Sequence, residues 1–422
     1  MKPLDLVYVP LAIVTAPWWA GKKREGWRSR FGFVEGLKPP RPASRGRIML
    51  HAVSVGEVAA LRYLIPVLIQ SVDVVLSVTT DTGLKRAREL FGPTDGCSIV
   101  RYPLDFSWAV ARFLDAVKVD VVGLVELEVW PHFVDACVQR QIPVAVINGR
   151  LSERSARGYG RIAWFFRRVL RKLAFAGVQD SDYAARFCAL GLPEDRCHIA
   201  GSIKWDAAKI EDSVAGADQL ATELGIDRSK PLIVAGSTGP EEEALLHAAC
   251  PPGVQLLCAP RKPERFDEAA AAMGPGVVRR TSRVVAPGST TRFLLDTIGE
   301  LRMAYSLATV VVVGRSFGAQ YGSDPIEPVA LGKPVVIGPA TSDFAAIVQV
   351  LTVAGGMIQT TREELAGVLA GLVEDDARCQ RLAAAGRDAI RGQQGASERY
   401  ARMLLAALDS KRAGVPVVSG GG

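Results

Sequence analysis

The chain lacks the motifs of several common enzyme classes. Neither half carries GxGxxG after its first predicted strand, which disfavours a dinucleotide oxidoreductase, and the absence of GxxxxGK[ST] argues against a P-loop NTPase. The four histidines have no metal-ligand spacing and the seven cysteines form no CxxC pair, so no structural zinc site is expected. We interpret the cysteines as reduced core residues of a cytosolic protein. A GxSxG match at residues 314–318 lacks the later histidine that a hydrolase needs and is read as coincidental.

Aromatic residues are scarce at 7%, but hydrophobic residues reach 49%, which is ample for globular cores. Basic residues do not alternate with aromatic ones, so no nucleic-acid partner is indicated. The net charge of +7 instead suits an anionic substrate or an anionic membrane surface. The length of 422 residues predicts two domains. Disorder is expected only in the Pro/Arg stretch at 39–46 and the Gly-rich tail at 419–422.

An apolar segment at residues 6–20 precedes a basic cluster at 22–30. It is shorter than the roughly 20 residues that span a bilayer, and two prolines interrupt it. Trp18 and Trp19 beside the basic cluster suit an interfacial position at a membrane, with the cations on the cytoplasmic side. The alternative is an N-terminal helix packed on its own domain.

Apolar, β-branched runs alternate with helical patterns, such as residues 57–70, and this alternation predicts parallel sheets with helices on both faces. The predicted strands are residues 48–54, 72–79, 98–102, 119–126, 142–148, 174–180 and 197–203, followed by 231–237, 254–260, 291–296, 309–314, 334–338 and 355–359. The fold class is therefore α/β, with an N-terminal segment at 1–30 and two doubly wound domains at 31–205 and 206–396. A last helix at 397–411, with Ser397 as its N-cap, either crosses back onto the first domain or does not.

The most informative stretch is His51 to Glu57, which directly follows an apolar strand. Open α/β sheets bind ligands at the carboxyl ends of their strands, and Gly56 permits a tight turn there. Glu57 is therefore a candidate general base.

Polar residues also follow the strands of the second half. Ser237 and Thr238 occupy a strand-to-helix turn, where backbone N–H groups favour a phosphate, and Arg261 after the next strand could bind the same phosphate. Glu327, at a predicted helix start, could accept hydrogen bonds from a ribose. Each also has a structural explanation: a helix cap, a pair with Glu264 or a favourable helix dipole. Their joint placement at strand ends favours function.

Seven motifs in this order resemble the 3-deoxy-D-manno-octulosonic acid (Kdo) transferases of lipopolysaccharide synthesis: HAVSVGE, ELEVWP, INGRLSERSARGYGRI, GSIKWD, PRKPERF, DTIGEL and DPIEPVALGKPVVIGP. The resemblance covers about residues 27–396. It implies a GT-B glycosyltransferase, with two Rossmann-like domains facing across a cleft. The acceptor side would be 31–205, and the CMP-sugar side 206–396.

The resemblance further implies CMP-Kdo as donor substrate, a lipid A precursor similar to lipid IVA as acceptor, and an inverting reaction without cofactor or metal. It also implies a place on the cytoplasmic face of the inner membrane, peripheral or anchored through the N-terminal segment.

The same resemblance assigns roles to single residues. Glu57 matches the family's general base, and Glu128 and Lys204 match positions of transition-state support, with Glu126 as a less certain choice. The residues that match the family's CMP-binding positions are Pro260, Arg261, Ile298, Gly299, Glu300, Asp324, Pro325, Ile326 and Glu327.

The chain departs from the family at its donor side. Gly239, Lys262 and Ser323 stand where the family has histidine, and Asp324 replaces an asparagine. A carboxylate beside an anionic CMP should weaken binding unless Arg315 or Lys262 offsets it, so an altered donor is one alternative.

Two alternatives from other classes are a nucleotide-sugar epimerase of the same architecture and a catalytically silent binding protein. An epimerase needs no membrane-facing surface, so deletion of residues 1–24 should leave it active.

Overall fold

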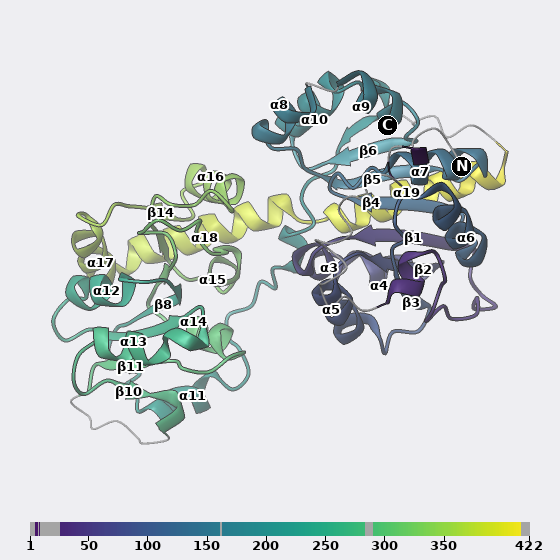
Figure 1. The fold of residues 1–422 in the computed structure, drawn as a ribbon. Helices are drawn as coiled ribbons and strands as arrows, with labels where there is room; N and C mark the ends of the chain where they lie inside the picture. Colours follow the sequence, from purple (N-terminus) through teal and green to yellow (C-terminus); the bar gives the residue numbers. More distant parts are fainter. Residues whose placement is uncertain (1–4, 7, 9–25, 161–162, 283–289, 415–422) are drawn as a thin grey trace. The chain divides into compact units, whose positions relative to one another are not determined.

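The computed structural model describes residues 5–6, 8, 26–160, 163–282 and 290–414. The chain divides into two compact units, which are coloured along the sequence in Figure 1. Unit 1 comprises Met1–Ala207 and Gln394–Gly422, and unit 2 comprises Ala208–Gln393. Each unit contains one sheet of seven parallel strands with helices on both faces, which is the predicted α/β class.

The sheet of unit 1 has the order β3-β2-β1-β4-β5-β6-β7. Its strands are β1 Arg47–Ala52, β2 Asp73–Val78, β3 Cys97–Arg101, β4 Val121–Val125, β5 Val144–Gly149, β6 Phe175–Val178 and β7 Cys197–Ile199. Strand order reverses between β1 and β4, and an open sheet binds its ligands outside the carboxyl ends of the strands at such a point.

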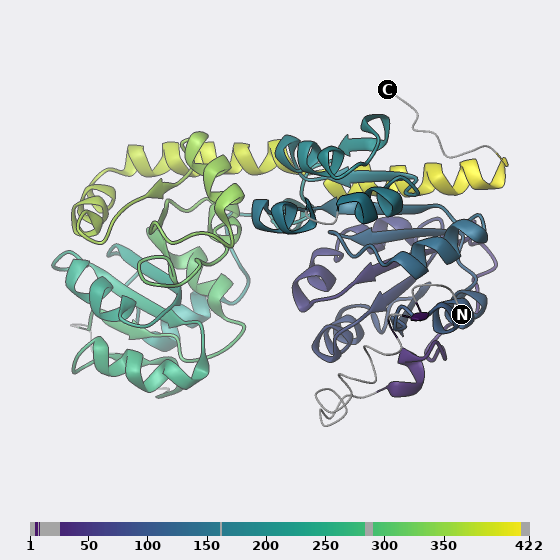
Figure 2. The same cartoon turned by 45° about the horizontal axis from the view of Figure 1, so that its top comes forward.

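Helices cover both faces of this sheet (Figure 2), so its central strands are buried on both sides and read as continuous apolar runs. One core contains residues of α3 Val55–Ala60, α4 Leu64–Leu68, α5 Asp81–Phe91 and α19 Ala396–Arg412. The other contains residues of α6 Ser107–Val117, α7 Pro131–Gln139, α9 Ala163–Leu170 and α10 Ser181–Ala189. The remaining short elements are α2 Trp27–Arg30, α8 Glu153–Gly160, η1 Glu194–Arg196 and η2 Trp205–Ala207.

The C-terminal helix α19 packs on unit 1. Tyr400 and Leu404 are fully buried in its core, and the Tyr400 hydroxyl donates to the Gly201 carbonyl at 2.8 Å. The expected cap is wrong, because Ser397 lies inside the first turn and the Asp206 carboxylate accepts its backbone N–H at 2.6 Å.

The sheet of unit 2 has the order β10-β11-β9-β8-β12-β13-β14, which reverses between β8 and β12. The strands are β8 Leu232–Thr238, β9 Gln255–Pro260, β10 Val278–Arg279, β11 Arg292–Leu294, β12 Val310–Val313, β13 Val335–Ile337 and β14 Ile358–Gln359. The helices are α11 Ala217–Leu224, α12 Glu242–Ala249, η3 Pro263–Arg265, α13 Phe266–Ala272, η4 Arg280–Ser282, α14 Leu301–Leu307, α15 Ile326–Ala330, α16 Ala345–Val353, α17 Leu365–Glu374 and α18 Asp376–Gln393.

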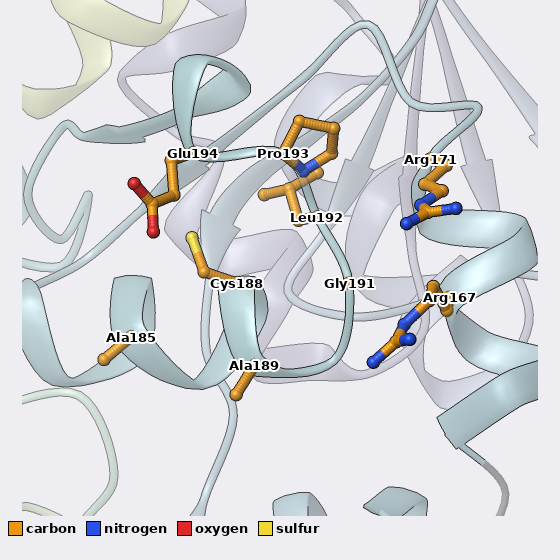
Figure 3. A pocket seen from close by; sticks show the side chains of 9 residues that line it. All are labelled: Arg167, Arg171, Ala185, Cys188, Ala189, Gly191, Leu192, Pro193 and Glu194. Carbon is orange, nitrogen blue, oxygen red and sulfur yellow. The ribbon is translucent and has the colours of Figure 1, made fainter.

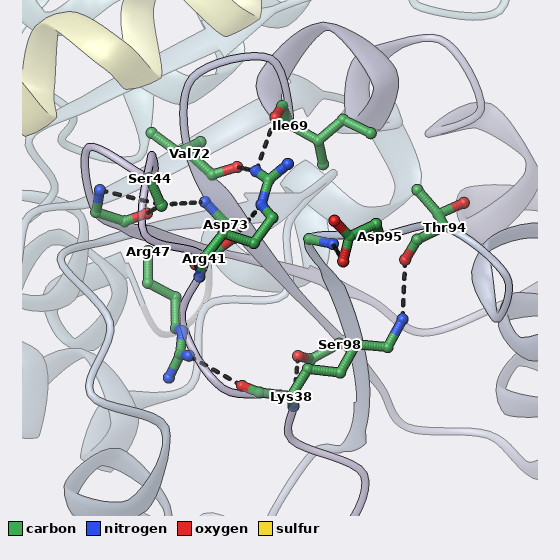
Figure 4. Close-up of polar contacts among 12 residues, drawn as sticks. Lys38, Arg41, Ser44, Arg47, Ile69, Val72, Asp73, Thr94, Asp95 and Ser98 are labelled. Atoms are coloured by element: carbon green, nitrogen blue, oxygen red, sulfur yellow. Dashed lines mark hydrogen bonds and ion pairs between the residues drawn. The ribbon is translucent and has the colours of Figure 1, made fainter.

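Two local predictions need correction. The helix predicted at 57–70 is split into α3 and α4, because Pro66 has no N–H for the carbonyl of Arg62. The stretch at 39–46 is ordered at the amino-terminal edge of the sheet, where Arg41 pairs with Asp73 at 2.7 Å (Figure 4). The guanidinium of Arg41 also donates to the carbonyls of Ile69 and Val72, which follow α4. These bonds hold the stretch against the sheet.

Candidate active site

Glu57 lies at the switch point of unit 1, in the first turn of α3. Ser54 is the N-cap of this helix and forms a capping box with Glu57. The Glu57 carboxylate accepts the backbone N–H of Val53 at 2.8 Å, and the hydroxyl of Ser54 at 2.7 Å. The side chain is therefore held in one orientation at the carboxyl end of β1, and it remains partly exposed.

Two more carboxylates, Glu126 and Glu128, follow β4, the strand beside β1. Burial and then the charge of Glu57 raise the pKa of both. The Trp130 indole donates to Glu128 at 3.2 Å and opposes the rise of that pKa. The backbone of Glu126 is left-handed at φ 60°, a strained conformation that often accompanies functional sites.

Lys204 and Arg150 complete the group, because their positive charges lower the pKa of Glu126. The position of Lys204 follows from its neighbour: the Asn148 side chain at the end of β5 accepts the backbone N–H of Ile203 at 3.2 Å. The structure thus brings together the predicted Glu57, Glu128 and Lys204. Sequence reasoning had not assigned a role to Arg150, although it follows a strand in the same way.

In unit 2, the ends of β8 and β9 are tied together. The Thr238 carbonyl accepts the backbone N–H of Arg261 at 3.1 Å. The Thr238 hydroxyl donates to the buried Glu243 at 2.6 Å, and Arg265 binds Glu243 with two hydrogen bonds at 2.8 and 3.0 Å. The ion-pair partner of Glu243 is therefore Arg265 and not Arg261. Arg261 directly follows Pro260 at the carboxyl end of β9.

Acidic residues of the chain occupy the amino-terminal end of α12. Glu241 is its N-cap residue, and Glu242 and Glu243 lie in its first turn. The Gly239 N–H donates to Glu242 at 2.7 Å. This helix end is consequently less suited to a phosphate than the sequence suggested, because three acids already meet its dipole. The role of Ser237, which is buried with φ 56°, stays a prediction.

The charges of three predicted residues act on one buried group, the hydroxyl of Tyr305 in α14. Burial, then the charges of Glu327 and Asp324, raise the pKa of Tyr305, and Arg261 lowers it. A side chain at position 236 would place its Cβ 2.0 Å from this hydroxyl, so the end of β8 needs Gly236. Nothing in the sequence marked Tyr305 as part of this group.

The third loop has internal partners of its own. Asp324 accepts the backbone N–H of Ile326 at 2.9 Å, which fixes the turn around Pro325 before α15. Glu327 pairs with Arg302 at 3.3 Å, and Arg302 also pairs with Glu211 at 2.6 Å.

The loop before α14 makes its hydrogen bonds with other residues. The Ile298 side chain is 72% exposed and Gly299 has φ 95°. Glu300 accepts hydrogen bonds from Thr297 and from Arg280, the latter at 3.1 Å. The roles of these three predicted residues stay predictions.

Two other features have no role in the predicted site. Ser316 of the GxSxG match is fully buried, and its hydroxyl donates to the Val313 carbonyl at 2.6 Å. An open hollow of about 700 Å³ in unit 1 is lined by Arg167, Arg171 and the loop after α10, as Figure 3 shows, and it includes none of the predicted residues.

Within the described residues, no three His, Cys, Asp or Glu side chains are placed to hold a metal ion. No helix in this part of the chain combines the length and apolar character needed to cross a bilayer. Most of the apolar segment 6–20 lies outside the described residues.

Comparisons with solved structures show the fold. The Anabaena protein HepE in complex with UDP and glucose superposes with a TM-score of 0.58 at 13% identity, over 86% of this chain and 100% of that one. The UDP-GlcNAc 2-epimerase of Neisseria meningitidis bound to UDP-GlcNAc gives 0.56 at 14%, over 85% and 99%. The two sheets and these neighbours agree with the predicted fold class. This class is the GT-B architecture, which glycosyltransferases share with epimerases.

Comparisons of sequence are more specific. A family model of 3-deoxy-D-manno-octulosonic-acid transferase (kdotransferase) matches residues 25–207. The 3-deoxy-D-manno-octulosonic acid transferase of Haemophilus influenzae is 30% identical over 97% of this chain and 96% of its own length. The transferase of the same name from Bordetella pertussis is 32% identical over 90% and 93%. The chain therefore belongs to the Kdo transferase family of glycosyltransferases.

Proposed function

We propose that the chain transfers Kdo from CMP-Kdo to a lipid A precursor similar to lipid IVA, with Glu57 as general base. The observation that carries this proposal is the group formed by Glu57, Glu126, Glu128 and Lys204 at the switch point of the unit 1 sheet. Three carboxylates beside the cations of Lys204 and Arg150 suit a reaction that moves a proton and develops positive charge on a sugar ring.

In this mechanism Glu57 takes the proton of an acceptor hydroxyl, whose oxygen attacks the anomeric carbon of Kdo as the bond to CMP breaks. The product anomer is inverted, because the attack is in line with the leaving group. The ring passes through an oxocarbenium-like state, which negative charge from Glu128 stabilises. Lys204 binds the Kdo carboxylate or an acceptor phosphate.

Unit 2 is the proposed CMP site. Arg261 binds the departing phosphate and Glu327 the ribose, and the charges that both exert on Tyr305 support their proximity. The positive charge that a metal ion would otherwise provide comes from Lys262, Arg261 and Arg315. We propose that no metal or cofactor is needed.

The acceptor is a lipid, so we also propose that the protein acts at the cytoplasmic face of the inner membrane. Trp164 of α9 is 73% exposed beside the exposed Arg167 and Arg168, a combination found at anionic lipid surfaces. The apolar segment 6–20 would add to this attachment.

The test is a transfer assay with purified full-length protein, CMP-Kdo and lipid IVA in detergent, with and without EDTA. We expect a lipid product heavier by one or more Kdo residues, release of CMP and no inhibition by EDTA. A folded protein that forms no such product would refute the assignment. Conversion of UDP-GlcNAc to its epimer, without transfer, would instead establish the epimerase alternative, which the shared fold alone does not distinguish.

A further inference from the structure

A buried carboxylate joins the loops of the proposed CMP site. Glu242, the first residue of α12, is only 2% exposed. Its two oxygens accept four backbone N–H groups: Gly239 at 2.7 Å, Arg315 at 2.6 Å, Ser316 at 2.8 Å and Phe317 at 2.9 Å. One donor comes from the loop after β8 and three from the loop after β12, the two strands at the switch point of the unit 2 sheet.

The three consecutive donors form an anion-binding nest. Arg315 has φ 58°, and a left-handed residue in such a position turns successive N–H groups toward one point. In many proteins a nest of this kind binds a phosphate, but here the chain supplies the anion itself. Gly314 is needed beside it, because a Cβ there would lie 2.6 Å from Thr238 Cα and 2.9 Å from the Glu242 carboxylate.

Short hydrogen-bonded paths lead from this carboxylate to the predicted donor residues. The Arg315 carbonyl accepts the N–H of Gly322 at 2.8 Å, and Asp324 follows two positions later. On the other side, Gly239 directly follows Thr238, whose carbonyl holds the N–H of Arg261. Removal of the carboxylate would release both loops at once.

We infer that Glu242 is a positioning residue of the donor site: its charge fills the nest at the β8–β12 switch point and fixes the Arg261 and Asp324–Glu327 loops before the nucleotide binds. This inference rests on the proposed use of unit 2 as the CMP site. It also implies that the CMP phosphate binds beside the nest and not in it, since the four N–H groups are already used.

The test exploits the vacancy that a small residue would create. Glu242→Ala leaves four inward-facing N–H groups without an acceptor, and formate is a carboxylate small enough to replace the lost one. We expect the variant to bind CMP, in calorimetry, at least about tenfold more weakly, because hydrogen bonds to a charged group order these loops. Added formate should restore much of that loss.

A matched control is Glu241→Ala. Glu241 is the neighbouring acid on the same helix end, but its side chain is 80% exposed and its nearest described partner is Arg362 at 3.9 Å. This control should bind CMP as the wild type does, with no response to formate. Glu242→Gln, which keeps the size of the side chain but turns an amide N–H₂ toward N–H donors, serves if the alanine variant does not fold. It should raise KM for CMP-Kdo and leave KM for the lipid acceptor unchanged.

The outcomes separate this inference from the proposed function. Wild-type protein that binds no CMP would refute the donor site and the inference together. Wild-type protein that binds CMP, with Glu242 variants that bind it equally well, would overturn the inference alone. A folded Glu242→Ala protein whose weakened binding ignores formate would also overturn it, since packing and not charge would then explain the loss.

Discussion

Glu57 has two possible uses, and substitution of two neighbouring residues can separate them. Its carboxylate completes the capping box of α3, and it is also the proposed base. Glutamine is accepted at the same position of a capping box, so Glu57→Gln removes the base and keeps most of the cap. Ser54→Ala does the reverse, because it deletes the N-cap hydroxyl and leaves the carboxylate in place.

The two variants should have opposite effects: Glu57→Gln should mainly slow transfer, and Ser54→Ala should mainly lower stability. Loss of general-base catalysis should slow transfer by about 10²–10⁴-fold in Glu57→Gln, with a change in unfolding free energy below about 1 kcal/mol. Loss of the cap in Ser54→Ala should cost about 1 kcal/mol of unfolding free energy. That variant should slow transfer by less than about tenfold, because one hydrogen bond that orients the carboxylate is lost.

Both quantities can be measured on the full-length protein. All seven tryptophans fall at or before Trp205, so urea unfolding followed by tryptophan fluorescence reports on unit 1. Transfer rates come from the mass-spectrometric product assay. If Ser54→Ala slowed transfer as much as Glu57→Gln, the geometry of the turn and not proton transfer would explain the role of Glu57. If Glu57→Gln retained near wild-type rates, Glu57 would not be the base.

Three further predictions concern acidity, the donor and backbone strain. Burial lowers the pKa of His51 to about 3, so its imidazole stays neutral in the folded protein, whereas in the unfolded chain it takes up a proton below its ordinary pKa of 6.5. Unit 1 should therefore lose about 2 kcal/mol of unfolding free energy by about pH 5. His51→Phe should reduce this loss in urea titrations. Arg261→Gln should weaken CMP binding about ten- to hundredfold in calorimetry, and unchanged affinity would exclude a phosphate contact. Glu126→Gly should stabilise unit 1 by about 1 kcal/mol in the same fluorescence assay, because it relieves the backbone strain at φ 60° and removes a carboxylate whose pKa burial raises. Destabilisation would show that the side chain is structurally required.

The strands were predictable because a parallel strand that is covered on both faces consists of a continuous run of apolar residues. The run at 48–54 became β1 and the run at 231–237 became β8, each within a few residues. Strand β10 was missed, since Val278–Arg279 is too short for any periodicity. The break between α3 and α4 was missed because the apolar pattern runs through Pro66 without interruption.

The site was predictable in outline for a related reason: polar residues after parallel strands end at one edge of a sheet. Glu57 and Glu128 share one edge in this way, because they follow the neighbouring strands β1 and β4, although Glu128 entered the prediction only through the family resemblance. Which acids are structural was not predictable. Glu241, Glu242 and Glu243 are one uniform run in sequence, yet one is exposed, one fills a nest and one pairs with Arg265. Only the geometry of the backbone distinguishes them.

The return of α19 to unit 1 makes the order of synthesis matter. Tyr400, Leu404 and Leu408 belong to the core that the strands of residues 47–199 begin, but Ala208–Gln393 must be translated before them. At ordinary translation speeds the ribosome needs roughly ten to forty seconds for that insertion. During this interval, one face of the first sheet to emerge lacks its last helix and exposes apolar surface. A nascent chain should therefore need chaperone protection until α19 leaves the ribosome, although unit 2 can meanwhile fold as a continuous segment.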